Sequence, residues 1–201
     1  MTKHTPIIEK KFRRFLGDAN EALMANLRAG RNRTPHLVDV VIEAARERLR
    51  ESLDAAETLE AIREIASNLL GCENMVLLCI DRKTGAFYPF WSFGIDAAKR
   101  SMMEALEEPA SYCAALGSTY IARDLEDQSA SRQHPRVTVF VPIRYQGEIK
   151  AVLALLQFLP QKLGIDMIDN EIFRILSEEA GSMLFPEDAG AAASGSPERQ
   201  S

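Results

Sequence analysis

The stretch Arg136–Pro160, RVTVFVPIRYQGEIKAVLALLQFLP, predicts the centre of the fold. Its first half alternates β-branched or apolar side chains with others, which is the period-two pattern of a strand. Gln146-Gly147-Glu148 predicts a tight turn, because Gly147 can take a positive φ without steric cost. Ile149–Leu159 is the most apolar run in the chain, yet it is too short to span a membrane. We therefore expect a hairpin whose second arm is a central strand covered on both faces.

Three amphipathic helices are predicted before the first strand. Apolar side chains recur near the 3.6-residue period over Ile7–Ala29, His36–Leu53 and Ala56–Leu70. The first helix is rich in lysine and arginine, which we interpret as a solvated face, with a partner-docking or anionic-surface patch as the alternative. Helices of this kind upstream of a sheet domain commonly pack on a second copy. We therefore expect a homodimer.

A second hairpin is predicted from Met75–Asp81 and Ala86–Phe93, with a turn between them. Pro89 lies inside the second arm, and a proline in a strand favours a sheet edge or a bulge. The remaining predicted elements are a helix Asp96–Glu107, a short helical turn Pro109–Leu116, a strand Ser118–Arg123, a polar loop Asp124–Pro135, and a closing helix Asp169–Phe185.

The composition limits the classes of function. The net charge of −5 leaves no global basic field for phosphates, so we expect no nucleic-acid binding. The three cysteines are odd in number, and no apolar signal segment precedes residue 30, so we expect a reducing, cytoplasmic compartment and no membrane anchor. We divide the chain into a helical extension, residues 1–55, a sheet domain, residues 56–185, and a disordered tail, residues 186–201.

The order of these elements resembles a GAF domain. Ala110–Leu125, ASYCAALGSTYIARDL, is similar to the family's helical turn before a short strand. Val139–Leu155, VFVPIRYQGEIKAVLAL, resembles its pattern of a proline-containing strand, a glycine turn and a strand of the type GVLAL, and Asp166–Met183 resembles its closing helix. The resemblance implies an α+β fold of the GAF or PAS type, with helices packed on a central antiparallel sheet and often a pocket under the loops. It does not fix the function, because members bind different ligands or none.

The family's known chemistries can be tested against the residues. The series associated with cyclic nucleotides is missing between residues 157 and 171, and Cys113 is not followed by the histidine of bilin-binding members. His4, His36 and His134 are too scattered for a metal site, and the sequence identifies no cofactor. A free methionine sulfoxide reductase using Cys113 is the enzyme alternative, but the loop Asp124–Pro135 lacks the resolving cysteine expected there.

A ligand pocket is the remaining hypothesis. Aromatic residues could form its walls, with Cys113 among them and polar side chains from the loop at its rim. The more ordinary interpretation of the aromatic residues is core or cross-strand packing, and that of His134 is a solvated loop residue. The candidate ligand-binding residues are Trp91, Phe93, Tyr112, Cys113, Tyr120, Arg123, Arg132 and His134.

The sequence therefore favours a non-catalytic sensory or regulatory module. It would bind a small molecule, a separate signalling protein, or both, and would signal through a helical dimer. The alternatives are the Cys113 reductase and a structural adaptor whose pocket is filled.

Overall fold

The computed structural model describes residues 34–95, 100–123, 137–159, 162 and 164–186. The predicted helix Ile7–Ala29, the loop Asp124–Pro135 and all but the first residue of the predicted tail lie outside these residues. The chain divides into two compact units, Met1–Ala44 and Ala45–Ser201. In the first, only the start of helix α2, Thr34–Arg50, is described. The second unit contains the sheet.

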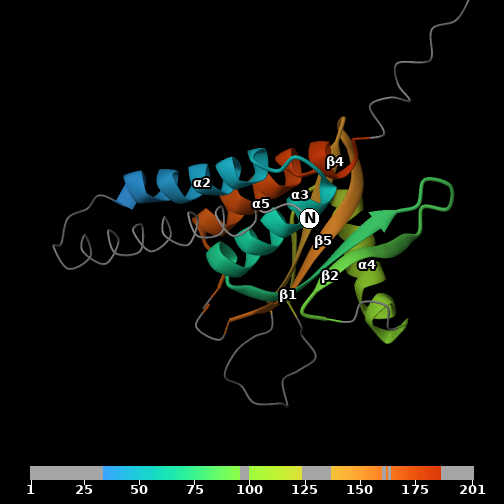
Figure 1. The fold of residues 1–201 in the computed structure, drawn as a ribbon. Coiled ribbons are helices and arrows are strands. Elements are labelled where there is room, and N and C mark those ends of the chain that lie inside the picture. The colour runs from blue at the N-terminus through green and yellow to red at the C-terminus, as the bar shows by residue number, and fades with distance from the viewer. Residues whose placement is uncertain (1–33, 96–99, 124–136, 160–161, 163, 187–201) are drawn as a thin grey trace, which may run out of the picture. The chain divides into compact units, whose positions relative to one another are not determined.

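The sheet has five strands in the order β2-β1-β5-β4-β3, and every pair is antiparallel. The most apolar strand, β5, lies in the middle, so the predicted α+β fold with a central antiparallel sheet is confirmed (Figure 1). The strands are β1 Cys72–Ile80, β2 Phe87–Phe93, β3 Tyr120–Arg123, β4 Val137–Tyr145 and β5 Glu148–Phe158.

The predicted central hairpin joins β4 to β5 by a two-residue turn. Tyr145 pairs with Glu148, and Gln146 and Gly147 between them have φ values of 52° and 81°. Two successive positive φ values match the twist of antiparallel strands, which is why glycine is favoured here. The predicted turn is confirmed, with Glu148 belonging to the strand.

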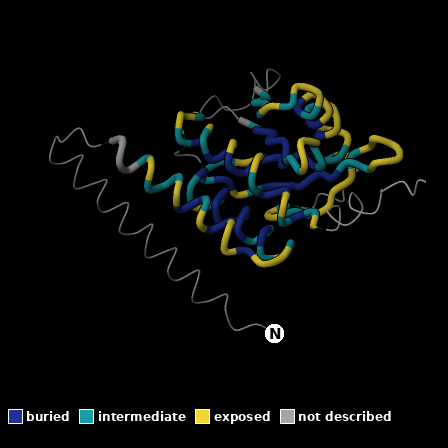
Figure 2. The backbone as a smooth tube through the Cα atoms, turned by 90° about the horizontal axis from the view of Figure 1, so that it is seen from above, coloured by how far each residue is buried: buried dark blue, intermediate teal, exposed yellow. Residues whose placement is uncertain are grey.

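The two faces of the sheet are covered by different helices. Helix α4, Arg100–Leu116, packs on one face, whereas α3, Ala55–Ile65, and α5, Met167–Glu179, cover the other (Figure 1). Side chains alternate between the faces along each strand. Figure 2 shows the buried backbone gathered in the strands and the inner turns of the helices. The cluster under α4 is formed by Val76, Leu78, Leu106, Ala110, Cys113, Phe140, Val152 and Ala154.

The edge position of β2 is confirmed, and so is its irregularity. The pairing register shifts between Leu77 and Leu78, opposite the segment that contains Pro89. A bulge and a proline both weaken further strand addition at a free edge.

Several predicted helix boundaries are wrong. Helix α4 continues through Pro109, where the sequence predicted a break, because Leu106 and Ala110 on either side of it are buried against the sheet. Helix α2 ends at Arg50, and Leu53, which was predicted on its apolar side, is 84% exposed. The predicted helix Ala56–Leu70 is α3 followed by a wider π turn, η1, Ala66–Leu70.

The closing helix is also interrupted. Helix α5 begins two residues earlier than predicted, because Asp166 caps it and Asp169 returns the contact to the backbone of Asp166. A separate short helix, α6, Gly181–Leu184, follows it. Across the described part of the chain, no helix combines the length and the apolar character needed to cross a membrane.

Candidate functional site

Cys113 lies at the centre of the face covered by α4. The helix buries this residue completely, and its sulfur lies 3.3 Å from the carbonyl oxygen of Phe140 and 3.5 Å from that of Ser118. Arg144 donates a hydrogen bond to the carbonyl of Gly117 at the end of α4, which places a cation at the negative end of the helix dipole. Cys113 is therefore a thiol that donates into the protein.

Two of the predicted aromatic residues lie beside this thiol. Tyr112 and Tyr120 make an edge-to-face contact with ring centroids 4.8 Å apart, and Tyr120 lies 6.2 Å from the ring of Phe140. Tyr112 is 52% exposed, whereas Phe140 is buried. The three rings thus form a path from the surface to the interior beside Cys113.

The other two aromatic residues lie on the opposite face of the sheet. Trp91 pairs with Leu77 and Phe93 pairs with Met75. Paired residues point to the same face, and Leu77 alternates with Val76 and Leu78 of the cluster under α4. Arg63 of α3 stacks over the ring of Phe93 at 5.2 Å, in agreement with this assignment. The structure therefore divides the four predicted aromatic residues between two surfaces.

The predicted polar rim falls mostly outside the described residues. The backbone of Arg123 pairs with Val137 at the end of β3, but its side chain is not among those described. Arg132 and His134 lie outside the described residues altogether. Among the residues that the structure does describe, no group of three or more His, Cys, Asp or Glu could hold a metal ion.

The other two cysteines lie away from Cys113. Cys79 follows Leu78 in β1, so its side chain points to the face opposite α4. Cys72 pairs with Phe158 on β5, four residues from Ala154, which is the partner of Phe140. Four residues of a strand span about 13 Å.

All three cysteines are buried and free. A disulfide needs Cα atoms within about 7 Å, and no pair that includes Cys113 meets this requirement without a large rearrangement. Burial raises the pKa of Cys72, Cys79 and Cys113 to about 11 in each case. The protonated thiol is therefore the stable form, whereas nucleophilic sulfur chemistry needs the thiolate.

The thiols are expected to react slowly with a disulfide reagent in the native protein. At pH 8 a thiol of pKa about 11 is ionised in about one molecule in a thousand, against about a quarter for a free cysteine. We expect native labelling at least about a hundredfold slower than labelling in urea, followed by absorbance. A single fast thiol that disappears in Cys113→Ser would contradict this assignment.

The same pKa values predict how stability depends on pH. Because the folded pKa values are raised, the three thiols contribute stability that is fully present below pH about 8.5 and is lost as pH rises toward about 11.

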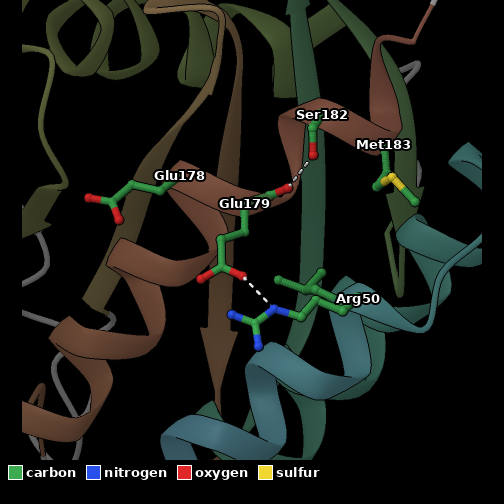
Figure 3. Close-up of a pocket in the computed structure, with 6 residues that line it drawn as sticks. Arg50, Glu178, Glu179, Ser182 and Met183 are labelled. Carbon is green, nitrogen blue, oxygen red and sulfur yellow. Dashed lines mark hydrogen bonds and ion pairs between the residues drawn. The ribbon is translucent and has the colours of Figure 1, made fainter.

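A surface hollow that the sequence did not predict lies at the end of α2. It has a volume of about 390 Å³ and lies between the last turn of α2 and the junction of α5 with α6 (Figure 3). Arg50 lies 3.8 Å from Glu179, and Arg46 lies 3.1 Å from the same carboxylate. These pairs join residues about 130 positions apart, so no local pattern could reveal them. The lining is formed by Leu49, Arg50, Glu178, Glu179, Ser182 and Met183.

Solved structures similar to this chain are GAF domains and related proteins. The GAF domain of an Acinetobacter phosphoenolpyruvate-protein phosphotransferase matches with a TM-score of 0.55 and 11% identity, covering 78% of this chain and 98% of that one. A methyl-accepting chemotaxis protein, residues 122 to 287, matches with a TM-score of 0.52 and 17% identity, covering 74% and 99%. The free methionine-R-sulfoxide reductase of Neisseria meningitidis, in complex with its substrate, matches with a TM-score of 0.50 and 14% identity, covering 76% and 92%.

The sequence comparisons agree with the fold. No curated protein matches the chain. The model of the GAF domain family matches residues 54–184, from the cap of α3 to the end of α6, and so includes every strand of the sheet. The chain therefore belongs to the GAF domain family.

Proposed function

We propose that this GAF domain is a non-catalytic regulatory module that responds to a small molecule or a partner protein and signals through a helical dimer. GAF domains are commonly sensory or regulatory, and one similar structure is a chemotaxis protein. Because likeness in fold alone does not define chemistry, the proposal depends on the site itself.

The observation that carries the proposal is the state of Cys113. Its sulfur is buried, donates to two backbone carbonyls, and has a pKa raised by burial to about 11. Cys79 is directed to the other face of the sheet, and Cys72 is about 13 Å away along it. A thiol enzyme needs a nucleophilic thiolate and a resolving thiol within reach, so this arrangement favours a structural role for Cys113.

An activity assay tests the enzyme alternative directly. We expect no thiol-dependent reduction of free methionine sulfoxide above background, and the same background with Cys113→Ser. Thiol-dependent turnover by the wild-type chain that is lost in Cys113→Ser would overturn the proposal, since the only chemical change is one sulfur.

Native mass spectrometry tests ligand binding. If a small molecule binds beside α4, the purified chain should carry an added mass that Tyr120→Ala removes, because Tyr120 connects the exposed Tyr112 to the core. Trp91→Ala is the matched control, since that aromatic side chain faces the other side of the sheet. An unmodified mass in every sample would instead favour the structural adaptor with a filled core.

The dimer and the compartment are parts of the same proposal. A ligand can shift a dimer between two arrangements only by as much as its affinities for them differ. Three free, buried cysteines fit a reducing environment, so we place the module in the cytoplasm.

A further inference from the structure

We propose that the hollow at the end of α2 is one half of the contact with a second copy of this chain. The inference rests on the dimer proposed above and names the surface that forms it. The hollow lies where the last residues of two helices meet, Arg50 of α2 and Glu179 of α5, with α6 closing one side (Figure 3).

The hollow has an apolar base and a charged rim. Leu49 is 3% exposed and forms part of the base with Met183, an adaptable side chain suited to irregular contacts. Arg50 and Glu178 are the most exposed of the rim charges in the lining, with 62% and 52% of their side chains accessible. Such a surface combines a place for an apolar side chain with charges directed outward.

The charges on this surface are arranged so that it complements itself. The arginines Arg46 and Arg50 come from α2, and the carboxylates of Glu178 and Glu179 come from α5. The ends of the two helices lie side by side, because both arginines reach Glu179. A partner of one charge sign would gain from one helix and be repelled by the other. A second copy avoids this conflict.

A two-fold axis running along the two helices, midway between them, gives the required pairing. It places α2 of one copy over α5 of the other, so that Arg50 faces the partner's Glu178 and the reverse contact forms by symmetry. A stable dimer buries about 800 Å² on each partner, more than the hollow alone supplies, so the contact extends along α2 and α5. The hollow would then take an apolar side chain of the partner.

Charge reversal tests this pairing. In Arg50→Glu and in Glu178→Arg, each homodimer would contain two like-charged pairs, and we expect the dimer Kd to rise about tenfold or more by analytical ultracentrifugation. Mixing the two variants restores opposite charges at both symmetry-related contacts, so the mixture should regain wild-type affinity. Glu171→Arg, on the same helix but outside the hollow, is the control and should keep the wild-type Kd.

The outcomes separate this inference from the proposed function. A wild-type chain that stays monomeric at all concentrations would remove both the dimer and its surface. A wild-type dimer whose Kd is unchanged by both reversals, or is not restored on mixing, would leave the dimer in place and overturn this surface. Thermal melts of the two variants show whether each is folded, and restoration by mixing cannot come from misfolded chains.

Discussion

Replacing Gly181 with alanine is expected to destabilise the domain by about 3 kcal/mol, the cost of overpacking where neither partner can move freely. An added Cβ would lie 2.0 Å from the carbonyl oxygen of Arg144 and 2.8 Å from its carbonyl carbon. Both atoms belong to the backbone of β4, which is paired on both sides in the sheet. Helix α6 would have to move away from β4, which would open the buried contact at Leu184.

The measurement is urea denaturation with a matched glycine control. Gly164→Ala introduces the same methyl group at an exposed position with nothing within 4 Å, so its midpoint should remain that of the wild type. Neither glycine has a positive φ, so the two variants differ in space and not in backbone strain. Equal midpoints for Gly181→Ala and the wild type would show that α6 is free to shift.

The sheet was predictable because its signals are local. The alternation before Gly147 and the apolar run after it determined β4, β5 and their turn without reference to any other part of the chain. Pro89 likewise indicated the edge position of β2. In each case one residue type limits the backbone directly, through φ, through a missing N–H or through period-two burial.

The helix ends and the site were less predictable, because tertiary contacts decide them. Pro109 weakens a helix by itself, yet the burial of Leu106 and Ala110 keeps α4 continuous. The aromatic residues near the first hairpin were predicted as walls of one pocket, but the register of β2 on β1 directs Trp91 and Phe93 away from α4. Sequence spacing gives alternation within a strand, and only the pairing determines which face each side chain joins.

Replacing Arg48 with methionine is the second substitution expected to have a large effect, a loss of about 3 to 5 kcal/mol. Arg48 of α2 donates to Glu64 of α3 at 2.6 Å, and both side chains are almost completely buried, with 8% and 4% exposed. Removing the guanidinium leaves a carboxylate in the interior without its partner, which costs more than the pair itself contributes. The change should appear as a lower urea midpoint.

The double variant Arg48→Met/Glu64→Leu separates the loss of a partner from the loss of packing. Because both charges are gone and the volumes are similar, we expect it to recover most of the stability that Arg48→Met loses. Glu171→Gln, which breaks an exposed pair with Arg174 at 2.9 Å, should leave the midpoint unchanged. If the double variant were as unstable as Arg48→Met, the arginine would act through its packed hydrocarbon chain, and the end of α2 would be held to the domain by apolar contact instead of by charge.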